Sequence, residues 1–140
     1  MSDLALTIPE LTTFLTEVFP QTAGSYEITE LAPMQATMRY YVNADHLRPG
    51  GTVSGPTMFT VADLAFYAAV LAMIGREPLT VTINLNINFM RKPAPGDLIG
   101  TARILKLGRL LATGDVTLTS MGDPRPVAHA QATYAIPPKG

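Results

Sequence analysis

Arg48 to Gly75 reads RPGGTVSGPTMFTVADLAFYAAVLAMIG, a glycine-rich loop that runs into a long and almost wholly apolar segment. Pro56 suits the first turn of a helix, and Gly75 suits the position just after its end. The stretch therefore predicts one helix over about residues 56–74. Its single charged residue is Asp63, and a carboxylate among apolar groups is costly unless a partner or a function requires it.

Three interpretations of this helix are open. Its length would cross a bilayer, but Asp63, the polar residues of the helix and the lack of a second apolar segment argue against a transmembrane span. A core helix that is apolar all round would be wrapped by a sheet or covered by a second subunit. The third interpretation adds a function. Helix N-termini favour negative charge, so the Gly55 N–H could stabilise an oxyanion while Asp63 acts as base or nucleophile. A lone buried aspartate can equally be a structural group whose hydrogen bonds are satisfied.

The segments on either side of this helix have simpler periods. Thr7-Ile8-Pro9-Glu10 has the spacing of a capping box and opens a short amphipathic helix that reaches residue 19. Alternating apolar residues predict a pair of strands within residues 25–42 and four later strands at about 79–90, 98–107, 110–121 and 126–136. This order predicts an α+β fold with an antiparallel sheet, in a single domain over residues 1–140.

The strand at 79–90 has the clearest alternation. One face is predicted to carry Val81, Ile83, Leu85, Ile87 and Phe89, and the other Thr80, Thr82, Asn84, Asn86 and Asn88. Three successive asparagines on one face are unusual because asparagine is depleted in strands. A solvated face and a polar site or subunit seam are both open interpretations.

Composition narrows the classes of function. The net charge of -1 gives no electrostatic footprint for nucleic acid or for an anionic membrane. Only 15% of the residues are charged, which favours an oligomer in which a partner subunit covers apolar surface. The absence of cysteine excludes disulfides and a thiol nucleophile. The first residues, MSDLALTIPE, lack the pattern of a secretory signal, so we expect a cytoplasmic location.

Other catalytic signatures are missing from the sequence. His46 and His129 lie at no metal-ligand spacing, so we expect structural roles for both and no metal site. The nucleophile motif of α/β-hydrolases, the P-loop and the dinucleotide-binding fingerprint do not occur.

Gly51-Thr52-Val53-Ser54-Gly55-Pro56, followed after four residues by Val61-Ala62-Asp63, resembles the hotdog-fold acyl-CoA thioesterases, most closely the phenylacetate-pathway (PaaI-like) type. The strand from Val81 to Met90, its Arg91-Lys92-Pro93 exit and the Gly96-Asp97 and Gly108-Arg109 turns are similar to the same family. The likeness spans about residues 25–136. It implies a hotdog fold, in which an antiparallel sheet wraps a long central helix, here with a short N-terminal helix. It also implies homodimers or homotetramers joined sheet edge to sheet edge, with the pocket between two subunits.

The resemblance assigns roles to individual residues. Asp63 matches the catalytic acidic residue, and Gly55 matches the glycine whose N–H polarises the thioester carbonyl. Where the family has asparagine, histidine and a second glycine, this chain has Arg48, Ser54 and Pro56. The candidate substrate-binding residues follow from the resemblance and from their places in the sequence relative to Asp63 and Gly55. They are Arg48, Ser54, Thr57, Thr60, Asn86, Arg91 and Arg109.

The expected function is hydrolysis of an aryl- or medium/long-chain acyl-CoA to the free acid and coenzyme A, with no cofactor beyond the coenzyme A thioester itself. A non-catalytic acyl-CoA- or lipid-binding hotdog protein is the alternative, motivated by Arg48 and Ser54. A hotdog hydratase is disfavoured because the Asp-x-Asn-Pro-x-His pattern is absent.

Overall fold

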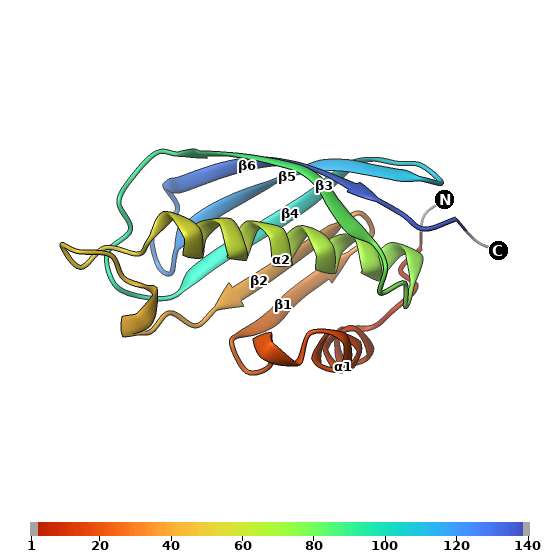
Figure 1. The fold of residues 1–140 in the computed structure, drawn as a ribbon, viewed down its shortest axis with the longest axis horizontal. Helices are drawn as coiled ribbons and strands as arrows, with labels where there is room; N and C mark the ends of the chain where they lie inside the picture. The colour runs from red at the N-terminus through yellow and green to blue at the C-terminus, as the bar shows by residue number, and fades with distance from the viewer. Residues whose placement is uncertain (1–2, 139–140) are drawn as a thin grey trace.

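A computed structural model describes residues 3–138 and shows an antiparallel sheet curved around one long helix (Figure 1). The elements are α1 (Ile8–Val18), β1 (Tyr26–Ala32), β2 (Gln35–Tyr40), α2 (Gly55–Ile74), β3 (Val81–Phe89), β4 (Leu98–Leu107), β5 (Leu111–Ser120) and β6 (Pro126–Ala135), with short 3₁₀ helices at Pro20–Thr22 and Ala44–His46. The six strands lie in the order β1-β2-β4-β5-β6-β3, so β1 and β3 are the two edges. The predicted α+β hotdog architecture is confirmed.

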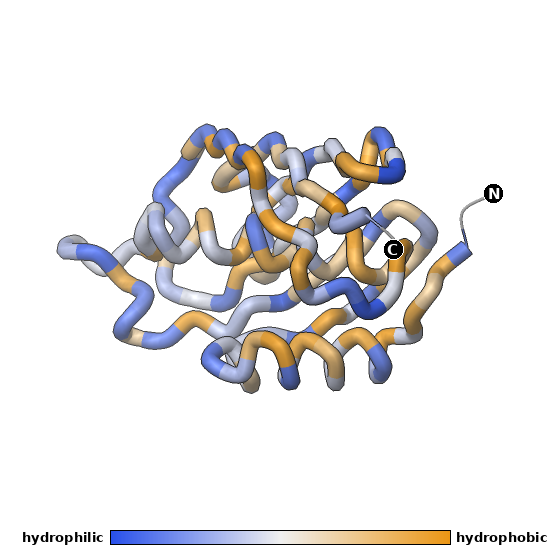
Figure 2. The backbone as a smooth tube through the Cα atoms, turned by 45° about the vertical axis from the view of Figure 1, so that its right-hand side comes forward, coloured by the Kyte–Doolittle hydropathy of each residue, from blue (hydrophilic) through white to orange (hydrophobic). Residues whose placement is uncertain are grey.

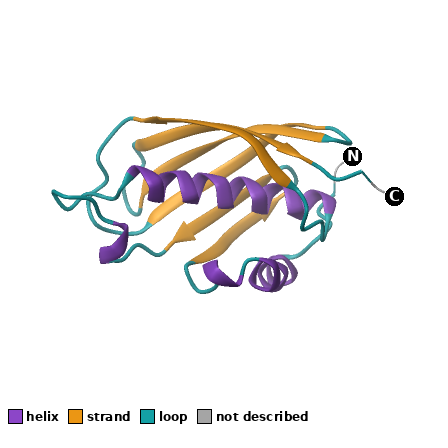
Figure 3. Ribbon diagram, in the orientation of Figure 1, coloured by secondary structure: helices purple, strands orange, loops and turns teal. Residues whose placement is uncertain are grey.

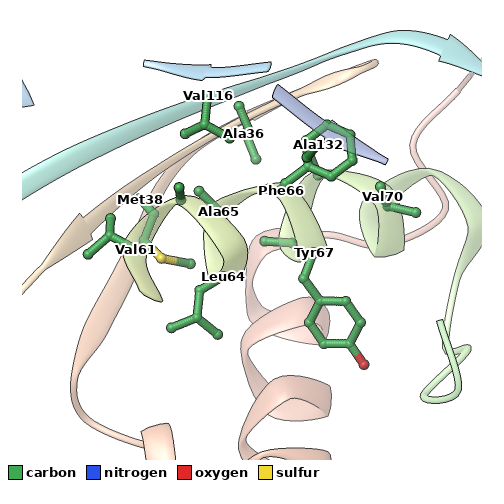
Figure 4. Packing of buried hydrophobic residues seen from close by; sticks show 14 of the residues in the cluster. Ala36, Met38, Val61, Leu64, Ala65, Phe66, Tyr67, Val70, Val116 and Ala132 are labelled. Carbon is green, nitrogen blue, oxygen red and sulfur yellow. The ribbon is translucent and has the colours of Figure 1, made fainter. Parts of the chain in front are cut away.

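The central helix α2 begins and ends where its sequence predicts. The Ser54 hydroxyl caps its start by accepting a hydrogen bond from the Thr57 N–H, and Gly75 ends it at a positive φ of 95°. The helix is long and apolar enough to cross a membrane, but 78% of its most apolar window is buried in the fold. Figure 4 shows Phe66 pointing from α2 toward Ala132 on β6, while Tyr67 projects away from the sheet. The core-helix interpretation of the sequence is therefore correct.

The N-terminal helix α1 covers the β1 edge of the sheet (Figure 3). Its predicted capping box is present: the Thr7 hydroxyl accepts from the Glu10 N–H, and the Glu10 carboxylate accepts from the Thr7 N–H. Hydrophilic and hydrophobic residues alternate around this helix (Figure 2), and the side chains buried beneath it are Leu11, Phe14 and Leu15.

The strand β3 differs from the prediction at its N-terminal end. Its register with β6 shifts by one residue between Thr82 and Asn84. Because of this bulge, Thr82 lies opposite the inward-facing Tyr134 and points toward α2, whereas strict alternation placed it on the asparagine face. Thr80, also predicted on the asparagine face, is buried, and Val81 and Ile83, predicted on the apolar face, are exposed. The predicted alternation holds beyond the bulge, where Leu85 and Ile87 are half-buried toward the core and the three asparagines are exposed on the outer face.

The strand β3 also leaves apolar surface uncovered in the protomer. More than half of the side-chain surface of Val81, Ile83 and Phe89 is exposed. One backbone edge of this strand has no neighbour among the strands that the structure describes. An exposed apolar edge strand is a site where another chain pairs.

Candidate active site

Asp63 lies in the third turn of α2, on the side that faces β3 and β6. Its Oδ1 accepts a hydrogen bond from the Thr82 hydroxyl at 2.8 Å and a second, short one from the Tyr134 hydroxyl. The other carboxylate oxygen, Oδ2, makes no hydrogen bond or ion pair with any residue between 3 and 138. One oxygen is therefore anchored and the other is available for chemistry.

Tyr134 reaches Asp63 from the last strand. It is 3% exposed, and its ring packs against Phe66 and Tyr67 of α2, with centroids 5.4 Å and 5.9 Å away. Burial raises the pKa of the Tyr134 hydroxyl far above its usual value, and the charge of Asp63 and the hydrogen bond to it raise this pKa further. The phenol therefore stays protonated and remains a donor to the carboxylate.

A pocket of about 700 Å³ opens beside Asp63. It lies between the end of α1, the exposed side of α2 and the start of β3, and most of its wall is apolar. Its lining residues are Val18, Phe19, Thr22, Thr60, Asp63, Leu64, Tyr67, Pro78, Leu79, Thr80, Val81, Thr82 and Tyr134. An apolar pocket with a few convergent polar groups is the usual form of a small-molecule site.

The N-terminus of α2 presents one free backbone donor. Ser54 Oγ accepts from the Thr57 N–H at 3.3 Å, and the Ser54 carbonyl accepts from the Met58 N–H at 3.1 Å. Pro56 has no N–H. The Gly55 N–H forms no hydrogen bond within the described chain, so it is the donor of the first turn that remains for a ligand.

The loop before α2 is tied to the segment after β3. Arg48 and Thr52 close a tight turn, in which Gly50 and Gly51 adopt positive φ values. The Val53 N–H donates to the Pro93 carbonyl at 3.0 Å, which brings the loop that carries Arg48 beside the segment that carries Arg91. Both arginines are exposed, and neither forms an ion pair in the part of the chain that the structure describes. They are available to an anionic ligand near Gly55.

The candidate substrate-binding residues at the start of α2 that carry hydroxyl groups form hydrogen bonds within the chain. The Ser54 and Thr57 hydroxyls lie 2.8 Å apart, and Thr57 is buried with its hydroxyl also directed at the His46 carbonyl. The Thr60 hydroxyl donates to the Pro56 carbonyl at 3.1 Å rather than to Asp63. Thr60 is exposed and lines the pocket, so its methyl group and oxygen still border any ligand there.

Two further candidates lie away from Asp63. Arg109 is in the β4–β5 turn, beside Met73 and Ile74 at the C-terminal end of α2. Asn86 is on the outer face of β3, where its Nδ2 donates to Asn84 Oδ1 at 2.9 Å. Neither contacts the pocket of its own protomer.

The two histidines are engaged outside the pocket. His46 Nδ1 accepts from the Asn43 N–H at 2.9 Å, and His129 Nε2 lies 3.0 Å from Asp115 Oδ2 on the outer face of the sheet. Within residues 3–138, no three acidic or histidine side chains gather as metal ligands would.

Gly55 and Asp63 do not meet within one protomer. Eight residues along a helix correspond to about 12 Å, and their neighbours on β3 differ accordingly: Gly55 lies beside the Phe89 ring, and Asp63 beside Thr82. A single thioester carbonyl cannot touch both.

Two residues of this site were not singled out by the sequence. Thr82 was placed on the wrong face because a bulge cannot be seen in an alternating pattern, and Tyr134 was one of several apolar residues of an inward strand face. Asp63 was found because a charge within an apolar helix is rare.

The sequence profile of the thioesterase superfamily matches residues 50–127, which include α2, β3 and Asp63. The chain belongs to the thioesterase superfamily.

Curated and solved relatives of this superfamily chain agree with that assignment. Human acyl-coenzyme A thioesterase 13 is 28% identical over 116 residues, which cover 82% of each chain. A candidate thioesterase from Silicibacter is 53% identical with a TM-score of 0.91, over 98% of this chain and 96% of its own. A point variant of the phenylacetic acid degradation protein PaaI from Thermus thermophilus is 28% identical with a TM-score of 0.73, over 84% of this chain and 99% of its own. The predicted PaaI-like hotdog family is confirmed.

Proposed function

We propose that this thioesterase-superfamily protein hydrolyses coenzyme A thioesters of aryl or medium/long-chain acids. The observation that carries the proposal is the Asp63 carboxylate, which is anchored through Oδ1 and has Oδ2 free beside an apolar pocket. The pocket would hold the acyl group. Arg48 and Arg91, exposed and near the start of α2, would bind the phosphates of coenzyme A.

The proposed reaction needs a base and an oxyanion donor. Asp63 takes a proton from water as the water oxygen attacks the carbonyl, or attacks the carbonyl itself to give an anhydride that water then opens. The Gly55 N–H of the partner subunit stabilises the oxyanion. When water attacks directly, the C–S bond then breaks and the coenzyme A thiolate receives the proton that Asp63 holds. When Asp63 attacks, the C–S bond breaks as the anhydride forms, and the water that opens the anhydride supplies the proton for the thiolate.

The second protomer would pair along β3. Gly55 lies beside Phe89 and Asp63 beside Thr82, so a two-fold axis that exchanges Gly55 and Asp63 between subunits passes near Phe59. The same axis crosses β3 near Asn86. Two β3 strands then pair antiparallel through their free edges, which covers Val81 and Ile83. We therefore propose a homodimer, or a tetramer made of two such dimers, which sedimentation at micromolar concentration tests.

The departures at Arg48 and Ser54 favour one alternative. The Ser54 hydroxyl is hydrogen-bonded to the Thr57 hydroxyl, and it also caps α2 by accepting from the Thr57 N–H. If the chemistry needs another side chain at that position, the protein binds acyl-CoA without turnover.

A panel assay separates the two functions. Free-thiol release from aryl- and fatty-acyl-CoAs is measured with the wild type and with Asp63→Asn, and Asp45→Asn on the surface serves as control. Hydrolysis requires a loss of roughly 100-fold or more in Asp63→Asn and none in the control. Activity that survives in Asp63→Asn would remove the assigned role of this residue. Tight binding of every acyl-CoA without thiol release would establish the binding function instead.

The oxyanion donor has its own test. Gly55→Pro deletes the N–H at the first helical position, where proline is well tolerated, and should lower kcat about 100-fold. Gly55→Ala keeps the N–H, and its Cβ would contact the Phe89 ring at an ordinary 3.4 Å. Equal loss in both variants would show that crowding at Gly55, and not the N–H, controls the rate.

A further inference from the structure

Tyr134 is held by packing against two aromatic rings of α2. It is 3% exposed, its ring stacks on Tyr67 and packs at a tilt against Phe66, and it lies 71 residues from Asp63 along the chain. The position of its hydroxyl is therefore set jointly by the sheet and by α2. A hydroxyl fixed in this way is a rigid reference point for a neighbouring side chain.

Both hydroxyl donors end on the same carboxylate oxygen. Thr82 and Tyr134 each donate to Oδ1 of Asp63, and the Tyr134 hydroxyl also lies 3.0 Å from the Asp63 carbonyl oxygen. A free carboxylate can rotate and exchange its two oxygens. Two donors on one oxygen, from two different strands, oppose that rotation and keep Oδ2 as the oxygen without an intramolecular partner.

We propose that Tyr134 is a positioning residue for Asp63: its hydroxyl, with that of Thr82, holds Oδ1 so that Oδ2 alone acts on the reacting water or thioester. This inference rests on the proposed thioesterase activity. When water is the nucleophile, its O–H bond breaks toward Oδ2 as its oxygen bonds to the carbonyl carbon. The proton leaves Oδ2 for the thiolate sulfur when the C–S bond breaks. Tyr134 keeps its own proton throughout.

The apolar pocket explains why the Asp63 carboxylate needs these two hydroxyl donors. The wall around Asp63 is mainly apolar, so few groups other than Thr82 and Tyr134 can orient the carboxylate. Small misplacements of a reacting group can lower a rate by about 100-fold. Water that replaced the phenol hydroxyl would give Asp63 a mobile partner in place of a fixed one.

The kinetic test uses Tyr134→Phe, which keeps the ring and its packing. We expect kcat to fall about 10- to 100-fold with KM changed less than about twofold, because the phenol does not bind substrate directly. Tyr40→Phe is the matched control: Tyr40 is also a buried sheet tyrosine, but its ring packs against His46. Thr82→Val should lower kcat in the same way, and Thr82→Ser, which restores the hydroxyl, should recover most of it.

A spectroscopic readout checks the contact without activity. In protein labelled with 3-fluorotyrosine, the ¹⁹F signal that disappears in Tyr134→Phe belongs to Tyr134. Asp63→Asn should shift that signal, while the signal that Tyr40→Phe removes should stay in place. A Tyr134 signal indifferent to Asp63→Asn would show that the two groups are not joined in solution.

The outcomes separate this inference from the proposed function. A wild type that hydrolyses no acyl-CoA overturns the proposed function, and the inference falls with it. A wild type that depends on Asp63 but keeps full kcat in Tyr134→Phe overturns the inference alone. A rise in KM with unchanged kcat assigns Tyr134 to substrate binding and also overturns it. Lost kcat with KM and the folding temperature preserved supports it.

Discussion

Gly114 shows how closely the sheet approaches the central helix at single residues. A Cβ at this position would overlap the Arg103 carbonyl oxygen and the ring of Phe66. Backbone atoms cannot move aside as a side chain can, so we expect Gly114→Ala to lower the free energy of unfolding by about 3 kcal/mol, measured by urea denaturation. Gly100→Ala is the control. Its Cβ would meet only side-chain atoms at 3.2–3.3 Å, and its cost should be below about 1 kcal/mol.

The buried phenol of Tyr134 should make stability fall at high pH. Its folded-state pKa is raised by burial and by Asp63, above the ordinary value of 10.0. Above pH 10 the unfolded chain releases this proton while the folded chain keeps it, so the free energy of unfolding falls as pH rises, by about 1.4 kcal/mol per pH unit.

Removal of the phenol should remove that contribution. Tyr134→Phe should show a shallower loss of stability between pH 10 and 11 than the wild type in denaturant titrations. Burial also raises the pKa values of Tyr26 and Tyr67, so the variant should still lose some stability as pH rises. Identical slopes in the two proteins would mean that Tyr134 is not buried in solution.

At the scale of residues, the sequence predicted what is locally rare. A charge within an apolar helix and a glycine before a proline identify Asp63 and Gly55 without any contact information. Thr82 and Tyr134 are ordinary strand residues, and only their pairing across β3 and β6 makes them neighbours of Asp63. No short segment of the sequence indicates which residues far apart in the chain will pair in this way.

At the scale of elements, almost every boundary could be predicted because hydrophobic period and capping signals agree. Predicted and observed spans differ by no more than one residue at either end for α2, β4, β5 and β6. The register of β3 could not be predicted, since the bulge after Thr82 keeps the same residue types and changes only the direction in which they point.

The cap of α1 offers a prediction about one element. Thr7→Ala removes the acceptor of the Glu10 N–H and should lower the free energy of unfolding by about 1 kcal/mol. Thr12→Ala, on an exposed side of the same helix, should cost far less. Differential scanning calorimetry of the two variants decides whether the capping box contributes in solution.

The outer face of β3 offers a second prediction about a single element. In the proposed dimer Asn86 lies opposite the partner's Asn86, so Asn86→Asp places two negative charges face to face. The dissociation constant should rise roughly tenfold at low salt and less at high salt, as measured by sedimentation. Asn88→Asp is the control because the same register places Asn88 opposite the partner's Asn84, where the added charge meets an amide. Equal effects of the two variants would contradict this register.

At the scale of the whole molecule, the proposed sharing of the site between two subunits predicts complementation. Asp63→Asn and Gly55→Pro should each lose roughly 100-fold in activity when expressed alone. In a mixed dimer of the two variants, one of the two sites combines an intact Asp63 with an intact Gly55. If the chains pair at random, half of the dimers are mixed, so co-expression should restore about a quarter of the wild-type activity when averaged over all sites. No recovery in a dimer shown to be mixed would mean that both residues act within one chain.

The unpaired edge of β3 also has a consequence for the lifetime of the separated chain. In the proposed dimer, pairing about a two-fold axis uses the free β3 edges of both copies at once, so growth along this edge stops at two copies. A separated chain keeps an open, partly apolar strand edge that is exposed to pairing with other chains. Dilution of the proposed dimer, or damage at its β3 edge, would then lower solubility before it unfolds the chain.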